Sequence, residues 1–178
     1  MNMKRKYLYV FAALMVALAL YSPKLRADQI FVANLTGAQD VPPTNSTATG
    51  FATVDLDSLQ TMITVNLTFS GLEGPATAAH IHGPALPGAN SGVLFPFTGV
   101  PSAVSGSIPT QTFAITPTQV GYLESGELYV NVHSTVFPGG EIRGQLEATP
   151  EPASLLLLGT GLLGLGFLVR KRRSAVHV

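Results

Sequence analysis

The feature that most constrains the fold of this chain is a strict alternation of apolar and polar residues. In the stretch QTMITVNLTF, residues 60–69, apolar side chains recur at every second position: Ile63, Val65, Leu67 and Phe69. Successive side chains of a strand point to opposite faces of a sheet, so this period predicts a strand with one buried face. The preceding stretch FATVDLD, residues 51–57, alternates in the same way after only a short connection. The two stretches therefore predict a β-hairpin.

Further stretches with strand character follow at close spacing along residues 28–149: 29–37, 77–83, 92–97, 110–116, 126–134 and 140–147. This part of the chain holds 14 Gly and 10 Pro, which leaves little room for long helices. Only residues 116–126 predict a short helical turn. About eight short strands predict an all-β domain over residues 28–149, either a β-sandwich or a Greek-key barrel.

The N-terminal residues 1–27 have the order of a secretory signal. Three basic residues, Lys4, Arg5 and Lys6, precede an apolar run from Tyr7 to Tyr21, and a short polar segment ends at Ala27. This order predicts a signal helix that is cleaved after Ala27. An uncleaved membrane anchor is the alternative.

The C-terminal residues predict a second membrane segment. Residues 153–169 carry no charge and consist mostly of Leu and Gly, and four cations follow directly: Arg170, Lys171, Arg172 and Arg173. Such a cluster favours the cytoplasmic side of a membrane. The pattern predicts a transmembrane helix over 153–169 with its tail inside the cell, so the domain before it is expected on the opposite side.

Three features in this order resemble the PEP-CTERM sorting signal of biofilm-forming Gram-negative bacteria. Pro150, Glu151 and Pro152 stand in front of the Gly/Leu-rich span and the basic cluster, and Thr149 replaces the Val of the common pattern. The resemblance implies that residues 150–178 are a sorting signal. It also implies processing by an exosortase-type enzyme, which releases the protein from the inner membrane into the envelope or the extracellular space. A plain membrane anchor is the alternative.

The charge of the predicted domain excludes one class of partner. Between residues 28 and 149 the only basic residue is Arg143, against nine acidic ones, which leaves a formal charge of −8. A surface with one cation cannot follow a phosphate backbone, so no nucleic-acid partner is expected. The chain has no Cys, which excludes disulfides, zinc–thiolate sites and cysteine nucleophiles.

Three stretches of the predicted domain resemble the CHRD domain, named from the extracellular protein chordin. They are GAQDVPPTNSTATGFATVDLD, AAHIHGPALPGANSGVLFPF and LYVNVHSTVFPGGEIRGQL. The resemblance implies an immunoglobulin-like β-sandwich and does not imply an established enzymatic activity. We expect a non-catalytic structural or binding role, with an extracellular protein or a polysaccharide as partner. The residues that carry the family pattern are Gly83, Pro84, Pro138, Gly139, Gly140, Glu141, Arg143 and Gly144.

Within this pattern, Pro138, Gly139 and Gly140 predict a tight reversal that pairs LYVNVHS with EIRGQLE as a hairpin. For Arg143, the residues favour a structural ion pair with Glu141 or Glu127. An arginine that contacts an anion or a substrate is the alternative.

Three histidines predict a metal site. His80 and His82 are two residues apart in AHIHGP and therefore share one face of a strand, while His133 ends a later strand. If the two strands are neighbours, the three imidazoles meet on the outer face of one sheet, where copper or zinc could bind. Histidines that only hydrogen-bond across the sheet are the alternative.

The spacing is also distantly similar to copper-zinc superoxide dismutase, in which a His-x-His strand, a later His and an active-site Arg recur. Residues His80, His82, His133 and Arg143 would take these places. A bridging histidine is missing, because only His177 remains and it lies in the tail. The leading interpretation is therefore a non-catalytic exported protein, and a copper- or zinc-binding protein is the alternative.

Overall fold

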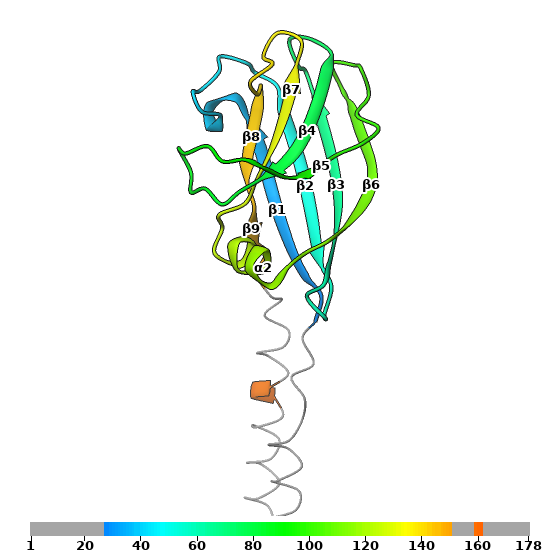
Figure 1. Ribbon diagram of the computed structural model, residues 1–178, viewed down its shortest axis with the longest axis vertical. Coiled ribbons are helices and arrows are strands. Elements are labelled where there is room, and N and C mark those ends of the chain that lie inside the picture. Colours follow the sequence, from blue (N-terminus) through cyan, green and yellow to red (C-terminus); the bar gives the residue numbers. More distant parts are fainter. Residues whose placement is uncertain (1–26, 151–158, 162–178) are drawn as a thin grey trace, which may run out of the picture. The chain divides into compact units, whose positions relative to one another are not determined.

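The computed structural model describes residues 27–150 and 159–161. The described residues fall into two units, one ending at Ala148 and one beginning at Thr149. The first unit contains nine strands and two short helices (Figure 1). The strands are β1 (Gln29–Thr36), β2 (Thr49–Leu56), β3 (Met62–Ser70), β4 (Ala76–His82), β5 (Val93–Pro96), β6 (Gly106–Ala114), β7 (Tyr129–Ser134), β8 (Ile142–Gln145) and β9 (Glu147–Ala148). The helices are the 3-10 helix η1 (Gly37–Gln39) and α2 (Pro117–Glu124).

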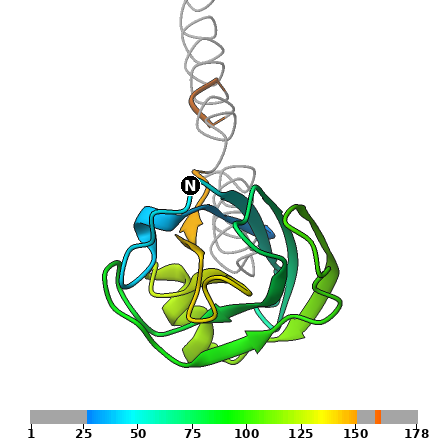
Figure 2. The ribbon, with the colours of Figure 1, turned by 90° about the horizontal axis from the view of Figure 1, so that it is seen from above.

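All strands belong to one antiparallel sheet with the order β5-β4-β7-β8-β1-β2-β3-β6, and β9 pairs with β1. The sheet curls around the core into a nearly closed barrel (Figure 2). The all-β prediction is confirmed. Within residues 27–150 the strands form one sheet and not two, because β8 joins β1 through the register pair Thr36 and Arg143. This narrow link divides the barrel into a β5-β4-β7-β8 half and a β1-β2-β3-β6 half.

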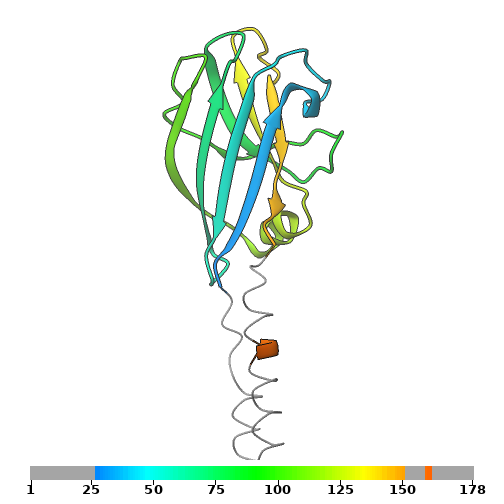
Figure 3. The same cartoon turned by 180° about the vertical axis from the view of Figure 1, so that it is seen from behind.

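The alternating sequence produces the β1-β2-β3-β6 half, which Figure 3 shows from behind. Strands β2 and β3 pair along their whole lengths, from Thr49 with Ser70 to Leu56 with Ile63, as the hairpin prediction requires. The predicted apolar faces of both strands are buried in the core. Each fully buried Val, Leu, Ile or Phe side chain contributes about 1.5–3 kcal/mol to folding.

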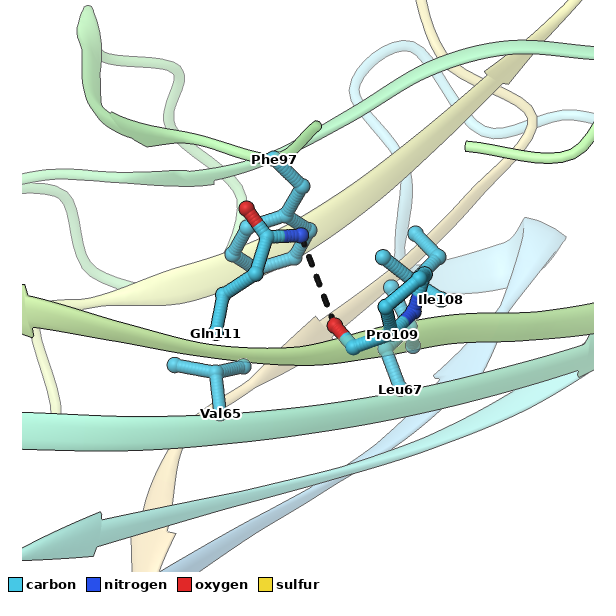
Figure 4. A pocket seen from close by; sticks show the side chains of 6 residues that line it. All are labelled: Val65, Leu67, Phe97, Ile108, Pro109 and Gln111. Carbon is cyan, nitrogen blue, oxygen red and sulfur yellow. Dashed lines mark hydrogen bonds between the residues drawn. The ribbon is translucent and has the colours of Figure 1, made fainter. Parts of the chain in front are cut away.

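The two edge strands, β5 and β6, approach each other where the barrel nearly closes. The side-chain amide of Gln111 on β6 accepts a hydrogen bond from the Thr98 backbone N at 2.9 Å and donates one to the Thr98 carbonyl at 2.9 Å. The Gln111 side chain therefore makes the two hydrogen bonds that a paired strand would make to the Thr98 backbone just after β5. Apolar side chains fill the space beneath it, and Gln111 also lies 3.5 Å from the Pro109 carbonyl (Figure 4). Pro109 lacks an N–H, which protects the β6 edge from pairing with another chain.

The predicted helical turn is a two-turn helix, α2, of eight residues. Thr116 caps it and Gln119 bonds back to the Thr116 backbone, which together form a capping box. Val120 and Leu123 are buried, which attaches α2 to the core.

The segments expected to meet the membrane lie almost entirely outside the described residues. This holds for the signal segment 1–27 except residue 27, and for the span 153–169 except the helical residues 159–161. Within the described residues, no helix combines the length and the apolar character needed to cross a membrane.

Candidate functional site

The outward side of strands β4, β7 and β8 carries a row of polar side chains, here called the polar face. The register places His82 beside Tyr129 and Gln145, and His80 beside Asn131 and Arg143. His133 lies opposite Ala78 at the end of β7. The members of the polar face are His80, His82, Tyr129, Asn131, His133, Arg143 and Gln145. The inward residues Ala79, Ile81, Val130, Val132 and Ile142 of the same strands are apolar and fully buried, as the period of two predicted.

The polar face is largely buried, although its side chains point away from the core. Loops 37–48, 83–92 and 135–141 lie over it, and Tyr129 is 2 % exposed and Arg143 1 % exposed. Loop 37–48 adds Asp40, whose Oδ1 accepts a hydrogen bond from Asn131 Nδ2 at 3.2 Å. Sequence reasoning did not identify Asp40, because no local pattern signals a contact over 91 residues.

The three histidines come together, as expected if β4 and β7 are neighbours. Each offers one ring nitrogen, and these nitrogens all lie within 4.8 Å of one another. His80 Nδ1 and His133 Nε2 are 3.1 Å apart. The ring centre of His80 lies 5.4 Å from that of His82 and 5.0 Å from that of His133.

Backbone carbonyls fix which nitrogen of two of these rings carries the proton. His82 Nδ1 lies 3.1 Å from the Ser91 carbonyl and His133 Nδ1 lies 3.1 Å from the Pro138 carbonyl. A carbonyl only accepts, so both Nδ1 atoms are protonated and both Nε2 atoms carry a lone pair. His133 Nε2 then accepts from His80. The buried Nε2 of His82 has no hydrogen-bond partner among the described residues.

The surroundings of His80 and His82 favour the neutral form of both rings. Burial, and then the neighbouring His133 and His82, lower the pKa of His80 to about 4. Burial also lowers the pKa of His82, against a smaller opposing effect of the Ser91 carbonyl. At neutral pH both rings therefore hold a lone pair, which is the state that binds a metal ion or accepts a hydrogen bond.

Tyr129 connects His82 to Arg143. Its ring stacks on His82 at 5.0 Å and an interplanar angle of 6°, and the guanidinium carbon of Arg143 lies 3.5 Å from the ring centre. Because β4 and β8 flank β7 on opposite sides, the Tyr129 ring lies between the His82 ring and the Arg143 guanidinium. The Tyr129 hydroxyl accepts from the Ser91 N–H at 3.0 Å, which positions the Ser91 carbonyl that holds His82.

The expected ion pair of Arg143 with Glu141 or Glu127 is wrong. Arg143 donates to neutral oxygens: the Ala89 carbonyl at 2.8 Å, Gln145 Oε1 at 3.2 Å, Asn90 Oδ1 at 3.3 Å and the Leu86 carbonyl at 3.5 Å. The guanidinium therefore fastens loop 83–92 onto the polar face. Burial lowers the pKa of Arg143, and Tyr129 and Asp40 act against this effect.

Glu141 has a different structural role. It is fully buried, and its Oε1 accepts from Ser46 Oγ at 2.6 Å and from the Glu73 N–H at 2.7 Å. Its carbonyl accepts from Thr44 Oγ1 at 2.8 Å. Glu141 therefore fastens loop 37–48, as Arg143 fastens loop 83–92.

The glycines and prolines of the family pattern shape the loops around this face. Gly83 and Pro84 begin loop 83–92, and Pro138 and Gly139 belong to the reversal before β8. Gly140 has a φ of +134°, and a Cβ there would lie 2.5 Å from Asp40 Oδ2 and 2.6 Å from Asn131 Nδ2. A Cβ on Gly144 would lie 2.6 Å from the Asn34 carbonyl. Both positions therefore require glycine.

A pocket of about 350 Å³ opens beside the polar face. Its lining includes Asp40, Pro43, Pro87, Arg143 and Gln145. Its volume lies within the range of small-ligand sites, and it combines charged, amide and proline surfaces.

Of the predicted sorting residues, only Pro150 is described, and it is exposed. Glu151, Pro152, Arg170, Lys171, Arg172 and Arg173 lie outside the described residues.

Comparison with known families gives two matches. The model of the CHRD domain matches residues 31–146, and the model of the PEP-CTERM protein-sorting motif matches residues 148–173. The comparisons with curated proteins and with solved structures returned no match.

Proposed function

The chain belongs to the CHRD domain family and carries a PEP-CTERM protein-sorting motif, and from this premise we propose that it is a non-catalytic binding protein of the cell envelope or extracellular matrix. The sorting motif supports export and processing by an exosortase. Before processing, the C-terminal segment anchors the chain in the inner membrane. After processing, the β domain acts outside that membrane.

One observation carries this proposal: the sorting motif begins at residue 148, two residues after the CHRD match ends. Four cations at 170–173 hold the C-terminal end on the cytoplasmic side. The β domain is therefore the translocated part, and nothing but a short connection separates it from the processing site.

The form of the domain supports a binding role. On this proposal, the two halves of the barrel correspond to the two layers of an immunoglobulin-like Greek-key sandwich, which serves as a rigid frame for loops. Arg143 and Glu141 fasten two of these loops, and the pocket of about 350 Å³ lies between them and β8. The formal charge of −8 on residues 28–149 disfavours nucleic acid and is compatible with a cationic partner. We propose an extracellular protein or a polysaccharide as the class of partner.

The test is to follow processing in a host that has an exosortase. The chain carries a tag after Val178, and antibodies to the β domain and to the tag are used on separated cell fractions. We expect the wild-type domain outside the inner membrane without its tag. The double variant Pro150→Ala/Pro152→Ala should remain in the inner membrane with the tag attached.

A matched control is Thr149→Val, which restores the common residue before the Pro-Glu-Pro and should be processed at least as well as the wild type. Equal distribution of the wild type and the double variant, both with the tag, would overturn the proposal.

A further inference from the structure

We propose that His80, His82 and His133 form a binding site for one late first-row divalent metal ion, Cu²⁺ most tightly and Zn²⁺ next. This inference goes beyond the proposed export and sorting and does not depend on them. It rests on the positions of the three imidazoles, on the groups that orient them and on one buried nitrogen without a partner.

The first step is the distance among the ring nitrogens. Three nitrogens that each lie about 2.0–2.1 Å from a tetrahedral metal ion are about 3.3 Å apart. His80 Nδ1 and His133 Nε2 are already 3.1 Å apart, and one ring nitrogen of each of the three histidines lies within 4.8 Å of the other two. Binding through His80 Nδ1 moves the proton of this neutral ring from Nδ1, where it bonds His133, to Nε2. Bringing the three nitrogens from separations of up to 4.8 Å to about 3.3 Å takes side-chain shifts of about 1 Å. The backbones need not move, because the rings stand on two paired strands.

The second step is the orientation of the rings. A metal-binding histidine usually donates its other N–H to a carbonyl or carboxylate, which fixes the ring and raises its basicity. The Ser91 carbonyl does this for His82, and the Pro138 carbonyl does it for His133. The Ser91 carbonyl lies on loop 83–92, which Arg143 holds in place, so the orientation of His82 is built into the fold.

The third step is the unpartnered nitrogen. His82 is 9 % exposed, and its Nε2 is buried with no hydrogen bond among the described residues. An unpaired buried polar atom costs about 1–3 kcal/mol. A metal ion would remove this cost, whereas histidines that serve only to bond across the sheet would leave it unexplained.

The donor set decides the class of metal. Three imidazoles and no thiolate suit Cu²⁺ and Zn²⁺, whereas Ca²⁺ and Mg²⁺ prefer oxygen ligands. For a nitrogen site of given geometry, Cu²⁺ binds more tightly than Zn²⁺. His80 and His133 are half-buried, so the fourth position is open to water or to an exchangeable ligand. Arg143 is kept from the ion by the Tyr129 ring that lies between it and His82.

The experiment uses the full chain, purified in detergent and stripped of metal with EDTA. Titration with Cu²⁺ and with Zn²⁺ should give one equivalent bound of each, with Cu²⁺ tighter. The variants His80→Gln, His82→Gln and His133→Gln should each lose more affinity than the 10- to 100-fold typical of changes outside the ligand set. Tyr129→Phe removes the hydroxyl that binds the Ser91 N–H, and its affinity for the metal ion should fall about tenfold.

The matched control is His177→Gln, because His177 is the fourth histidine of the chain and lies in the tail. Its affinity should equal that of the wild type. The electron paramagnetic resonance spectrum of the Cu²⁺-loaded wild type should show coupling to three imidazole nitrogens, and this result does not depend on the folding of any variant. Absence of binding, fewer than three coupled nitrogens, or affinity lost only in His177→Gln would overturn the site.

Discussion

The two halves of the barrel follow the same period of two and differ in what covers their outward faces. On β3 the outward residues, such as Asn66 and Thr68, are exposed to solvent. On β7 the outward residues Tyr129 and Asn131 are buried beneath loops. Alternation therefore fixes which side chains face the core, but it does not fix which of the others face water. The difference identifies the polar face as the part of the outer surface that the fold shields and orients.

The strongest test of this difference removes the cation that fastens loop 83–92. Arg143→Ala leaves the Ala89 and Leu86 carbonyls without their donor and removes the contact with Tyr129. We expect the free energy of unfolding to fall by about 3–5 kcal/mol. The matched change on the other half, Thr112→Ala on exposed β6, should cost no more than about 0.5 kcal/mol. Urea unfolding measures both, and equal losses would mean that the polar face is not specially fastened.

A second test compares two glycines with positive φ, one in each half. Gly140→Ala puts a methyl group 2.5 Å from Asp40 Oδ2, whereas Gly71→Ala, after β3, finds no atom closer than 3.8 Å. We expect losses of about 2–4 kcal/mol for Gly140→Ala and about 1 kcal/mol for Gly71→Ala. Thermal unfolding measures the difference. Similar losses would show that only backbone strain matters and that the space beside Asp40 is not filled.

The outcome for the sequence-based predictions follows the same division. The β2–β3 hairpin, the inward faces and the meeting of the three histidines were predictable, because period and register are local or depend on one strand pairing. The partners of Arg143 were not predictable. Glu141 lies before β8 begins at Ile142, so it does not share the strand geometry that would align it with Arg143. The choice between a two-sheet sandwich and a single curled sheet was also not predictable, because it depends on one register pair between β1 and β8.

A smaller effect is expected from pH in the metal-free protein. The pKa of His80 in the folded chain is about 4, below its ordinary 6.5, so between these values the unfolded chain binds more protons. Stability should therefore be complete above pH 6.5 and fall as the pH drops from 6.5 to 4. His80→Gln should weaken this fall. The effect is modest because the ring is half-exposed and solvent screens it.

The β2–β3 turn provides the contrast in the other half. Hydrogen bonds, first from the Met62 N–H, lower the pKa of Asp57 below its ordinary 3.8. Its contribution is present above pH 3.8 and is lost only at lower pH. Asp57→Asn should leave the melting temperature between pH 6.5 and 4 with the same slope as the wild type. A slope that changes in Asp57→Asn and not in His80→Gln would contradict the assignment.

The central claim is that the polar face positions three imidazoles to bind one metal ion. Long-range nitrogen–proton NMR of the full chain at pH 7, before and after one equivalent of Zn²⁺, tests it most directly. Before addition, His82 and His133 should show the tautomer protonated at Nδ1. After addition, the nitrogen signals of His80, His82 and His133 should shift together while those of His177 stay in place. Protonation of His82 or His133 at Nε2 in the metal-free protein, or three unmoved imidazoles after zinc, would contradict the account.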